Sequence, residues 1–209
     1  MLNFDPDLAA ARADLCRFLS ACYYEPCAEF AEEHLFDSML ACATRLSPGM
    51  AAQAKRLGDA FAATDLQTLL VDYTRLFLGP AQPLATPYGS CWLTADATPE
   101  QDATAALLVR YHEGGFVIDD DFHDLPDHVA VELEFLYLLL FKQHQAASSG
   151  NAADAADAAA LAATAQHFLR DHLGAWVSPF TVAVAAGAQT AFYRELGTLT
   201  FDFVQMSQA

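Results

Sequence analysis

The chain has 209 residues, of which 54% are hydrophobic and 18% are charged, so it can bury a core and is not disordered over most of its length. Its 27 acidic and 10 basic side chains give a net charge of −17. This charge argues against binding to nucleic acid or to anionic lipid, since both need clustered Lys and Arg. It would attract a basic ligand or peptide, although solubility alone also accounts for it.

Residue usage predicts an all-α protein. Alanine and leucine dominate, strand-forming residues are sparse, and apolar residues recur at spacings of three and four. We expect a single bundle of about nine to ten helices. The five cysteines contain no Cys-x-x-Cys pair and leave one unpaired in any disulfide scheme, which favours reduced thiols in a cytoplasmic protein. We identify no export signal and no apolar run near the ~20 residues that span a bilayer, so we expect no membrane insertion.

The first helix is predicted to begin at Asp5-Pro6, an N-cap acid followed by a proline at the first helical position, and to end near Tyr24. Asp65 is predicted to cap a fourth helix that ends at Gly79-Pro80. The other helices are expected at about 28–46, 50–62, 99–112, 124–145, 152–173, 176–186 and 188–203.

Residues 79–98 form a long irregular segment that contains three prolines and two glycines. Structureless loops of this length are uncommon inside compact domains and are often functional. This one carries Tyr88, Cys91 and Trp92. Either these side chains pack the loop onto the core, or they form the wall of a groove.

Residues 124–141 join a polar turn to a nearly all-apolar helix. Helix capping accounts for part of the turn: Asp124 is placed as the N-cap, Pro126 falls in the first turn, and Asp127 stands where a capping-box acid stands. Capping does not account for His128, Glu132 and Glu134. Titratable groups beside a buried helix are costly and are often functional. The plain alternative is a boundary histidine paired with Glu132, four residues further on.

A metal site is one functional interpretation of these residues. His123, His128 and Glu132, with the acids at 119–121, supply nitrogen and oxygen ligands. A helical di-metal site also needs Glu-x-x-His elements on two helices, and we find no second element. Catalysis has less support, because the chain has no Gly-x-Ser-x-Gly elbow and no phosphate-binding glycine loop. A helical metalloprotein with ligands near residues 119–132 is therefore the alternative hypothesis.

Two motifs, about fifty residues apart, resemble those of a known family. The first is Asp72-Tyr-Thr-Arg-Leu-Phe-Leu-Gly-Pro80, followed by Pro87-Tyr-Gly-Ser90. The second is Pro126-Asp-His128, followed by Glu132-Leu-Glu-Phe-Leu136. Together and in this order they resemble the signature of the TorD/DmsD/NarJ family of molybdoenzyme-specific chaperones, also called redox enzyme maturation proteins.

The resemblance implies a cytoplasmic, non-enzymatic chaperone with an all-helical fold and no intrinsic cofactor. Such a protein binds the twin-arginine leader of an apo-molybdoreductase, proofreads its export and assists insertion of its molybdopterin cofactor. Family members occur as monomers and as domain-swapped homodimers. We accordingly expect an N-terminal helical subdomain at 1–118, a hinge at 119–126 and a C-terminal helical subdomain at 127–209. Some members bind guanine nucleotide weakly, and this sequence has no loop that would explain such binding.

The resemblance also implies which residues bind the peptide. By position in the two motifs they are Tyr73, Leu76, Phe77, Pro87, Tyr88, Pro126, Asp127, His128 and Glu132. Acidic members of the set can meet guanidinium groups through charge-assisted hydrogen bonds, and the aromatic and aliphatic members can meet the apolar part of a leader. Plain core packing is the alternative for Leu76 and Phe77. Tyr88 stands where some relatives have tryptophan, which leaves the preferred client open. A helical scaffold that binds some other basic protein is a further alternative.

Overall fold

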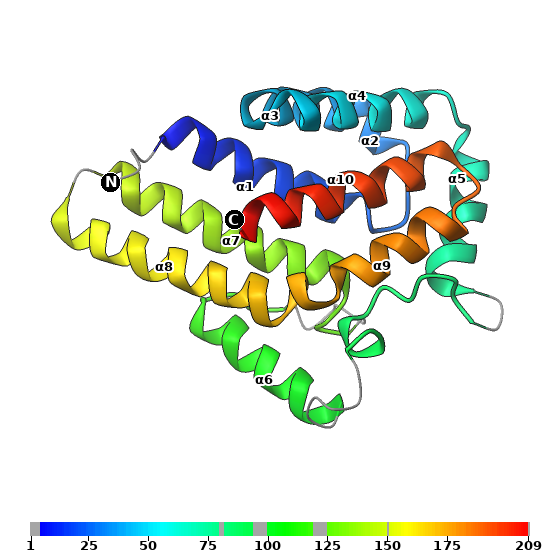
Figure 1. The fold of residues 1–209 in the computed structure, drawn as a ribbon. Helices are drawn as coiled ribbons and strands as arrows, with labels where there is room; N and C mark the ends of the chain where they lie inside the picture. Colours follow the sequence, from blue (N-terminus) through cyan, green and yellow to red (C-terminus); the bar gives the residue numbers. More distant parts are fainter. Residues whose placement is uncertain (1–4, 80–81, 94–99, 119–124, 150, 209) are drawn as a thin grey trace.

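A computed structural model describes residues 5–79, 82–93, 100–118, 125–149 and 151–208. Within these residues the protein is all-α: ten α-helices are present and no strand is (Figure 1). The predicted fold class is confirmed. In the same ranges, no helix has the length and apolar character needed to cross a bilayer.

The helices are α1 Pro6–Ala21, α2 Glu29–Glu32, α3 Leu35–Leu46, α4 Pro48–Ala62, α5 Leu66–Tyr73, α6 Glu100–Glu113, α7 Val129–Ser148, α8 Ala152–Asp171, α9 Leu173–Gly187 and α10 Ala191–Gln208. A π-helical turn, η1 (Thr74–Leu78), continues α5, and a 3-10 turn, η2 (Gly89–Cys91), lies in the long loop.

Side-chain caps set several helix starts. Asp5 accepts a hydrogen bond from the N–H of Asp7 at the start of α1, and Asp65 accepts one from Thr68 at the start of α5, as predicted. Ser47 accepts the N–H of Met50, so α4 begins at Pro48, two residues before the predicted position. Each cap satisfies one of the otherwise unpaired N–H groups of a first helical turn.

Two of the predicted helices that differ from the structure are those at 28–46 and 124–145. The helix expected over 28–46 is divided into α2 and α3 by His34, whose φ of 54° is left-handed and cannot continue a right-handed helix. The helix expected to begin at Asp124 begins at Val129. His128 has extended backbone, so Pro126 and Asp127 stand before the helix rather than in its first turn. Asp124 itself lies outside the described residues, as do Asp119, Asp120, Asp121 and His123.

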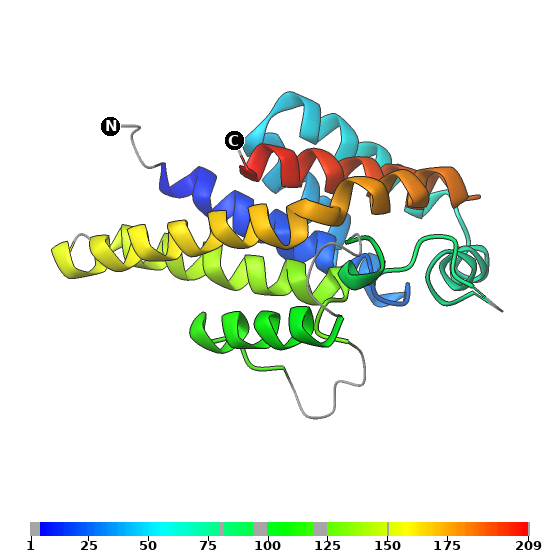
Figure 2. The same ribbon diagram turned by 60° about the horizontal axis from the view of Figure 1, so that its bottom comes forward.

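Helix α7 is central to the bundle. It packs against α1 on one side and α8 on the other, while α3 and α4 form a layer over α1 and α10 (Figures 1 and 2). The apolar stripe of α7, made of Val129, Leu133, Leu136 and Leu140, is buried. One contiguous core joins residues from helices on both sides of the proposed hinge. The division into 1–118, 119–126 and 127–209 stays a prediction, and most of 119–126 lies outside the described residues.

The turn after η1 depends on glycine. Gly79 has φ 61° and ψ 150°, and its N–H bonds to the carbonyl of Thr74 at 2.6 Å. A β-carbon at this position would lie 2.5 Å from the backbone carbonyl of Gln82. Only glycine adopts this backbone conformation without strain.

We therefore expect Gly79→Ala to lower the free energy of unfolding by about 2 kcal/mol, as measured by urea denaturation. Gly49→Ala is the matched control, because a β-carbon at Gly49 in α4 meets only the Ser47 hydroxyl at 3.8 Å. Alanine in that helix is expected to be neutral or stabilising. Equal stabilities for the two variants would contradict the argument.

Candidate functional site

The two sequence motifs meet in space at the start of α7. An isolated antiparallel bridge pairs Tyr88 with His128. The N–H of Val129 donates to the carbonyl of Pro87 at 2.8 Å, and the N–H of Gly89 donates to the carbonyl of Asp127 at 2.9 Å. The long loop therefore forms hydrogen bonds with the Val129 N–H and the Asp127 carbonyl, which an earlier helical turn would have used for itself. For this reason α7 begins later than predicted. We call residues 87–92 and 125–132 the junction.

His128 is the N-cap of α7. Its Nδ1 accepts the N–H of Ala130 at 3.1 Å, which places the proton of the neutral ring on Nε2. The ring stacks on Tyr24 with centroids 6.0 Å apart and meets the edge of Tyr88 at 5.5 Å. With 3% of its surface exposed, His128 performs the capping role that the sequence assigned to Asp124 and Asp127.

Asp127 holds the long loop instead of capping α7. Its Oδ2 accepts the N–H of Ser90 at 2.8 Å, at the start of η2. Its Oδ1 is buried and has no hydrogen-bond partner among the described residues. Asp127 is 6% exposed, so this oxygen is an unusual group: buried carboxylate oxygens are nearly always hydrogen-bonded.

Glu132 lies one turn into α7 and is 2% exposed. Both of its carboxylate oxygens lie 3.3 Å from the Nε1–H of Trp176, which donates to them from α9. Burial raises the pKa of Glu132 well above its usual value, the Asp127 charge raises it further, and the Trp176 hydrogen bond opposes the shift. Gly89 packs so closely that a β-carbon there would lie 3.2 Å from Glu132 Oε1.

A cavity of about 20 Å³ lies among Asp127, Glu132, His172 and Trp176. This volume suits about one water molecule and is too small for an apolar side chain. The described residues contain no group of three or more His, Cys, Asp or Glu that could hold a metal ion. Of the three ligands in the metal hypothesis, His128 uses Nδ1 as a helix cap, Glu132 is bonded to Trp176, and His123 lies outside the described residues.

Glu134 belongs to a different surface from Glu132. Its Oε1 accepts the hydroxyl of Ser20 in α1 at 3.4 Å and that of Tyr24, which follows α1, at 3.0 Å. Burial raises the pKa of Glu134, and these two hydrogen bonds oppose the shift. Because it is half-buried and bonded to α1, Glu134 contributes to helix packing and serves below as a reference carboxylate.

The first motif contains a buried acid to which the sequence reasoning assigned no role. Asp72 is 1% exposed. Its carboxylate accepts the N–H of Gln189 at 3.0 Å, the N–H of Thr190 at 2.7 Å and the Thr190 hydroxyl at 2.8 Å, and Arg75 donates to it at 3.1 Å. Asp72 thus joins α5 to the turn between α9 and α10. An acid inside an otherwise apolar helical stripe was the signal that could have revealed it.

Tyr73, Leu76 and Phe77 are buried in the core. The Phe77 ring meets the edge of Tyr73 at 5.3 Å, and it also meets Tyr23 at 6.0 Å. Core packing, the plain alternative, accounts for these three side chains in this structure. A role for them in peptide binding stays a prediction.

Tyr88 and Pro126 are the half-exposed members of the predicted peptide-binding set, whereas Pro87 is buried. Trp92 packs the loop down: its Nε1–H donates to the Thr86 carbonyl at 2.7 Å, and its ring meets Phe180. The Tyr111 hydroxyl of α6 donates to the Pro126 carbonyl at 2.8 Å. The junction therefore presents a small surface at Tyr88 and Pro126 over a closed interior.

Comparison with known proteins gives consistent matches. The family model described as nitrate reductase delta subunit matches residues 43–182. The chain is 26% identical over 181 residues to the chaperone protein TorD of Shewanella loihica, which covers 84% of this chain and 78% of the relative. It is 31% identical over 106 residues to the chlorate reductase assembly chaperone of Ideonella dechloratans, covering 50% of this chain and 51% of the relative.

A solved structure has the same fold. The crystal structure of a putative redox enzyme maturation protein from Archaeoglobus fulgidus superposes with a TM-score of 0.55 at 17% identity, covering 92% of this chain and 93% of that one. At this identity the likeness concerns the fold alone. It supports the helical arrangement described above.

Proposed function

We propose a client and a mode of binding for this chain from the premise that it belongs to the nitrate reductase delta subunit family and is a maturation chaperone of the TorD type. The proposed client is the apo form of a molybdopterin-dependent oxidoreductase, recognised by its twin-arginine leader. Binding in the cytoplasm would keep the enzyme from export until its molybdenum cofactor has been inserted. The chaperone itself needs no cofactor for this role.

One observation carries the proposal. The family match over residues 43–182 includes both motifs, and residues of the two motifs pair directly at Tyr88 and His128. Residues far apart in the chain thus form one surface. The acidic character of the protein, with a net charge of −17, favours a basic peptide as its ligand.

The proposed contacts at the junction differ in accessibility. Tyr88 and Pro126 offer half-exposed apolar surface for the first contact. Asp127 follows Pro126 and is buried; among the described residues its Oδ1 has no hydrogen-bond partner, so a guanidinium group could bond it once the 87–92 loop moves. Glu132, Tyr73, Leu76 and Phe77 are buried, so their proposed contribution to binding requires movement of the 87–92 loop.

We expect Asp127→Asn to weaken leader binding at least tenfold, since it removes the charge but keeps an oxygen for the Ser90 N–H. Isothermal titration calorimetry with synthetic leaders of the molybdoreductases from the same genome would measure the change. Glu134→Gln is the control, because that carboxylate faces α1 and not the junction.

Two results would count against the proposal. The first is that no leader binds the unaltered chain. The second is that Asp127→Asn and Glu134→Gln bind equally well, which would leave the junction with a structural role only. Light scattering of the free and peptide-bound chain would at the same time report its oligomeric state, which we propose to be a monomer or a domain-swapped homodimer.

A further inference from the structure

A groove of about 530 Å³ opens between α2, the start of α3 and the second half of α4. Its volume is within the range of pockets that take ligands and bulky side chains. The apolar side chains of its floor are Phe30, Phe36, Leu40 and Phe61, all of them half-buried. None of these residues belongs to either motif, and the groove has no part in the junction.

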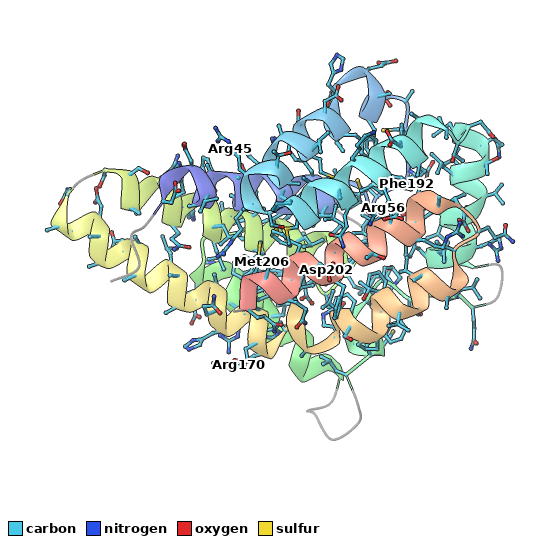
Figure 3. All side chains as sticks on the ribbon, turned by 45° about the horizontal axis from the view of Figure 1, so that its top comes forward. Arg45, Arg56, Arg170, Phe192, Asp202 and Met206 are labelled. Atoms are coloured by element: carbon cyan, nitrogen blue, oxygen red, sulfur yellow. The ribbon has the colours of Figure 1, made fainter. Side chains whose placement is uncertain are left out.

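The aromatic floor is anchored from below. The rings of Phe36 and Phe61 have centroids 4.6 Å apart, and both meet Phe192 of α10, at 5.9 and 5.6 Å. Figure 3 places Phe192 and Arg56 together where α10 and α4 lie side by side. Phe30 comes from α2, which has no buried residue, and its ring meets Phe61 at 6.1 Å. The groove is thus an apolar surface whose aromatic floor packs on α10 and whose α2 wall contains no buried residue.

The rim of this groove is acidic. The exposed acids Asp37 and Asp59 line it, and three more exposed acids, Glu29, Glu32 and Glu33, are neighbours in sequence of the lining residues Phe30, Ala31 and His34. Lys55 of the lining is paired with Asp59 at 2.7 Å, and the His34 ring lies 3.3 Å from Asp37, so the unbalanced negative charge beside the groove comes from Asp37 and the three glutamates. A ligand that fits this surface therefore has an apolar stretch for the aromatic floor and basic residues for the rim.

We propose that the α2–α4 groove binds the apolar stretch of the client's leader, with the leader's basic residues against the acidic rim. This inference rests on the proposed function and adds the place where the apolar part is held. The junction cannot hold that part as it stands, because its cavity of about 20 Å³ has no room for an apolar side chain. The groove offers both the space and the opposite charge.

One leader is long enough to contact the groove and the junction together. Export signals run to about 15–30 residues. An extended segment of 15 residues spans up to ~50 Å at about 3.3 Å per residue. A compact chain of this length has a radius of gyration of roughly 17 Å, so such a segment can cross its surface.

The test fills the groove from two sides. Ala31 of α2 and Ala62 of α4 are exposed lining residues, so Ala31→Trp and Ala62→Trp occupy the groove without opening a core cavity. Fluorescence anisotropy with a labelled leader peptide is expected to give at least tenfold weaker binding for each variant. Ala63→Trp, an exposed position just outside the lining, is the matched control and is expected to bind as the unaltered chain does.

A second arm tests the charge. The double variant Asp37→Asn with Asp59→Asn is expected to weaken binding severalfold and to reduce its dependence on salt. The control is Asp154→Asn with Asp157→Asn on α8, which changes the net charge equally away from the groove. A leader with serines in place of its apolar residues should bind weakly, and its affinity for Ala62→Trp should equal its affinity for the unaltered chain.

The outcomes separate this inference from the proposed function. A leader that does not bind the unaltered chain overturns both. A leader that binds, but with equal affinity to Ala31→Trp, Ala62→Trp and Ala63→Trp, overturns the groove and leaves the chaperone role intact. Photo-crosslinking from a benzophenone in the apolar stretch gives an independent answer: adducts within residues 30–64 support the groove, and adducts confined to 87–92 and 125–132 contradict it.

Discussion

Replacing Asp72 with alanine is expected to lower the free energy of unfolding by about 3–5 kcal/mol, measured by urea denaturation. The reason is the number of groups that depend on this carboxylate. It accepts the backbone N–H groups of Gln189 and Thr190 and the Thr190 hydroxyl, in a place where water does not replace it. Each buried donor left without a partner costs about 1–3 kcal/mol.

Asp65→Ala is the comparison for this experiment. Asp65 caps the same helix, α5, but it is exposed and bonds mainly to Thr68. Loss of such a cap costs about 1 kcal/mol. If Asp72→Ala were no more destabilising than Asp65→Ala, the buried hydrogen bonds to the α9–α10 turn would not have the structural importance assigned to them.

The second large effect concerns Glu132 and pH. Burial raises the pKa of this carboxyl group above its value of 4.5 in an unfolded chain, so the folded protein holds a proton that the unfolded chain releases. The stability that this proton brings is fully present below pH 4.5 and is lost as pH rises toward the folded-state pKa. While Glu132 stays protonated in the folded chain, each pH unit above 4.5 lowers the free energy of unfolding by about 1.4 kcal/mol.

Glu132→Gln should remove this slope. Glutamine has nearly the same shape, keeps an oxygen for the Trp176 Nε1–H, and does not ionise. We expect the variant and the unaltered chain to be similarly stable at pH 5, and the variant to become the more stable as the pH is raised, by about 1.4 kcal/mol for each pH unit over which Glu132 keeps its proton. Urea denaturation across this range would measure the difference. Parallel curves for the two proteins would show that Glu132 does not titrate as argued.

A second group with a shifted pKa lies near Glu132, which is why the comparison uses a difference. Asp127 and His172 line the same cavity, and burial lowers the pKa of His172. The titration of His172 is common to both proteins, whereas the effect of the Asp127 charge on Glu132 is part of the difference that is measured. Asp154→Asn on α8 provides a control for the loss of one negative charge elsewhere.

These two predictions bear on how the family motifs should be interpreted. Much of the first motif has a structural explanation here: Asp72 holds the α9–α10 turn, Phe77 is core, and Gly79 makes a turn that other residues cannot make. In the second motif, His128 caps α7 and Asp127 holds η2. A motif can thus identify a family because its residues build the fold, while the ligand contacts a neighbouring surface.

The sequence by itself determined the helical class, most helix positions and the family resemblance. The caps at Asp5 and Asp65 were predictable because an N-cap acts on backbone groups two or three residues away. The apolar stripe of α7 was predictable because helical periodicity is local. The pair of motifs was recognisable because it depends on residue identity and order alone.

Only the tertiary structure decided the start of α7, the partners of the buried acids and the groove between α2 and α4. Local capping favours Asp124 or Asp127 as the N-cap. The long loop instead pairs with His128 and Val129, so that α7 begins at Val129 with His128 as its N-cap. Asp72, Asp127 and Glu132 bond to groups 117, 37 and 44 residues away. Such long-range contacts follow from how helices pack, and no local pattern in the chain specifies them.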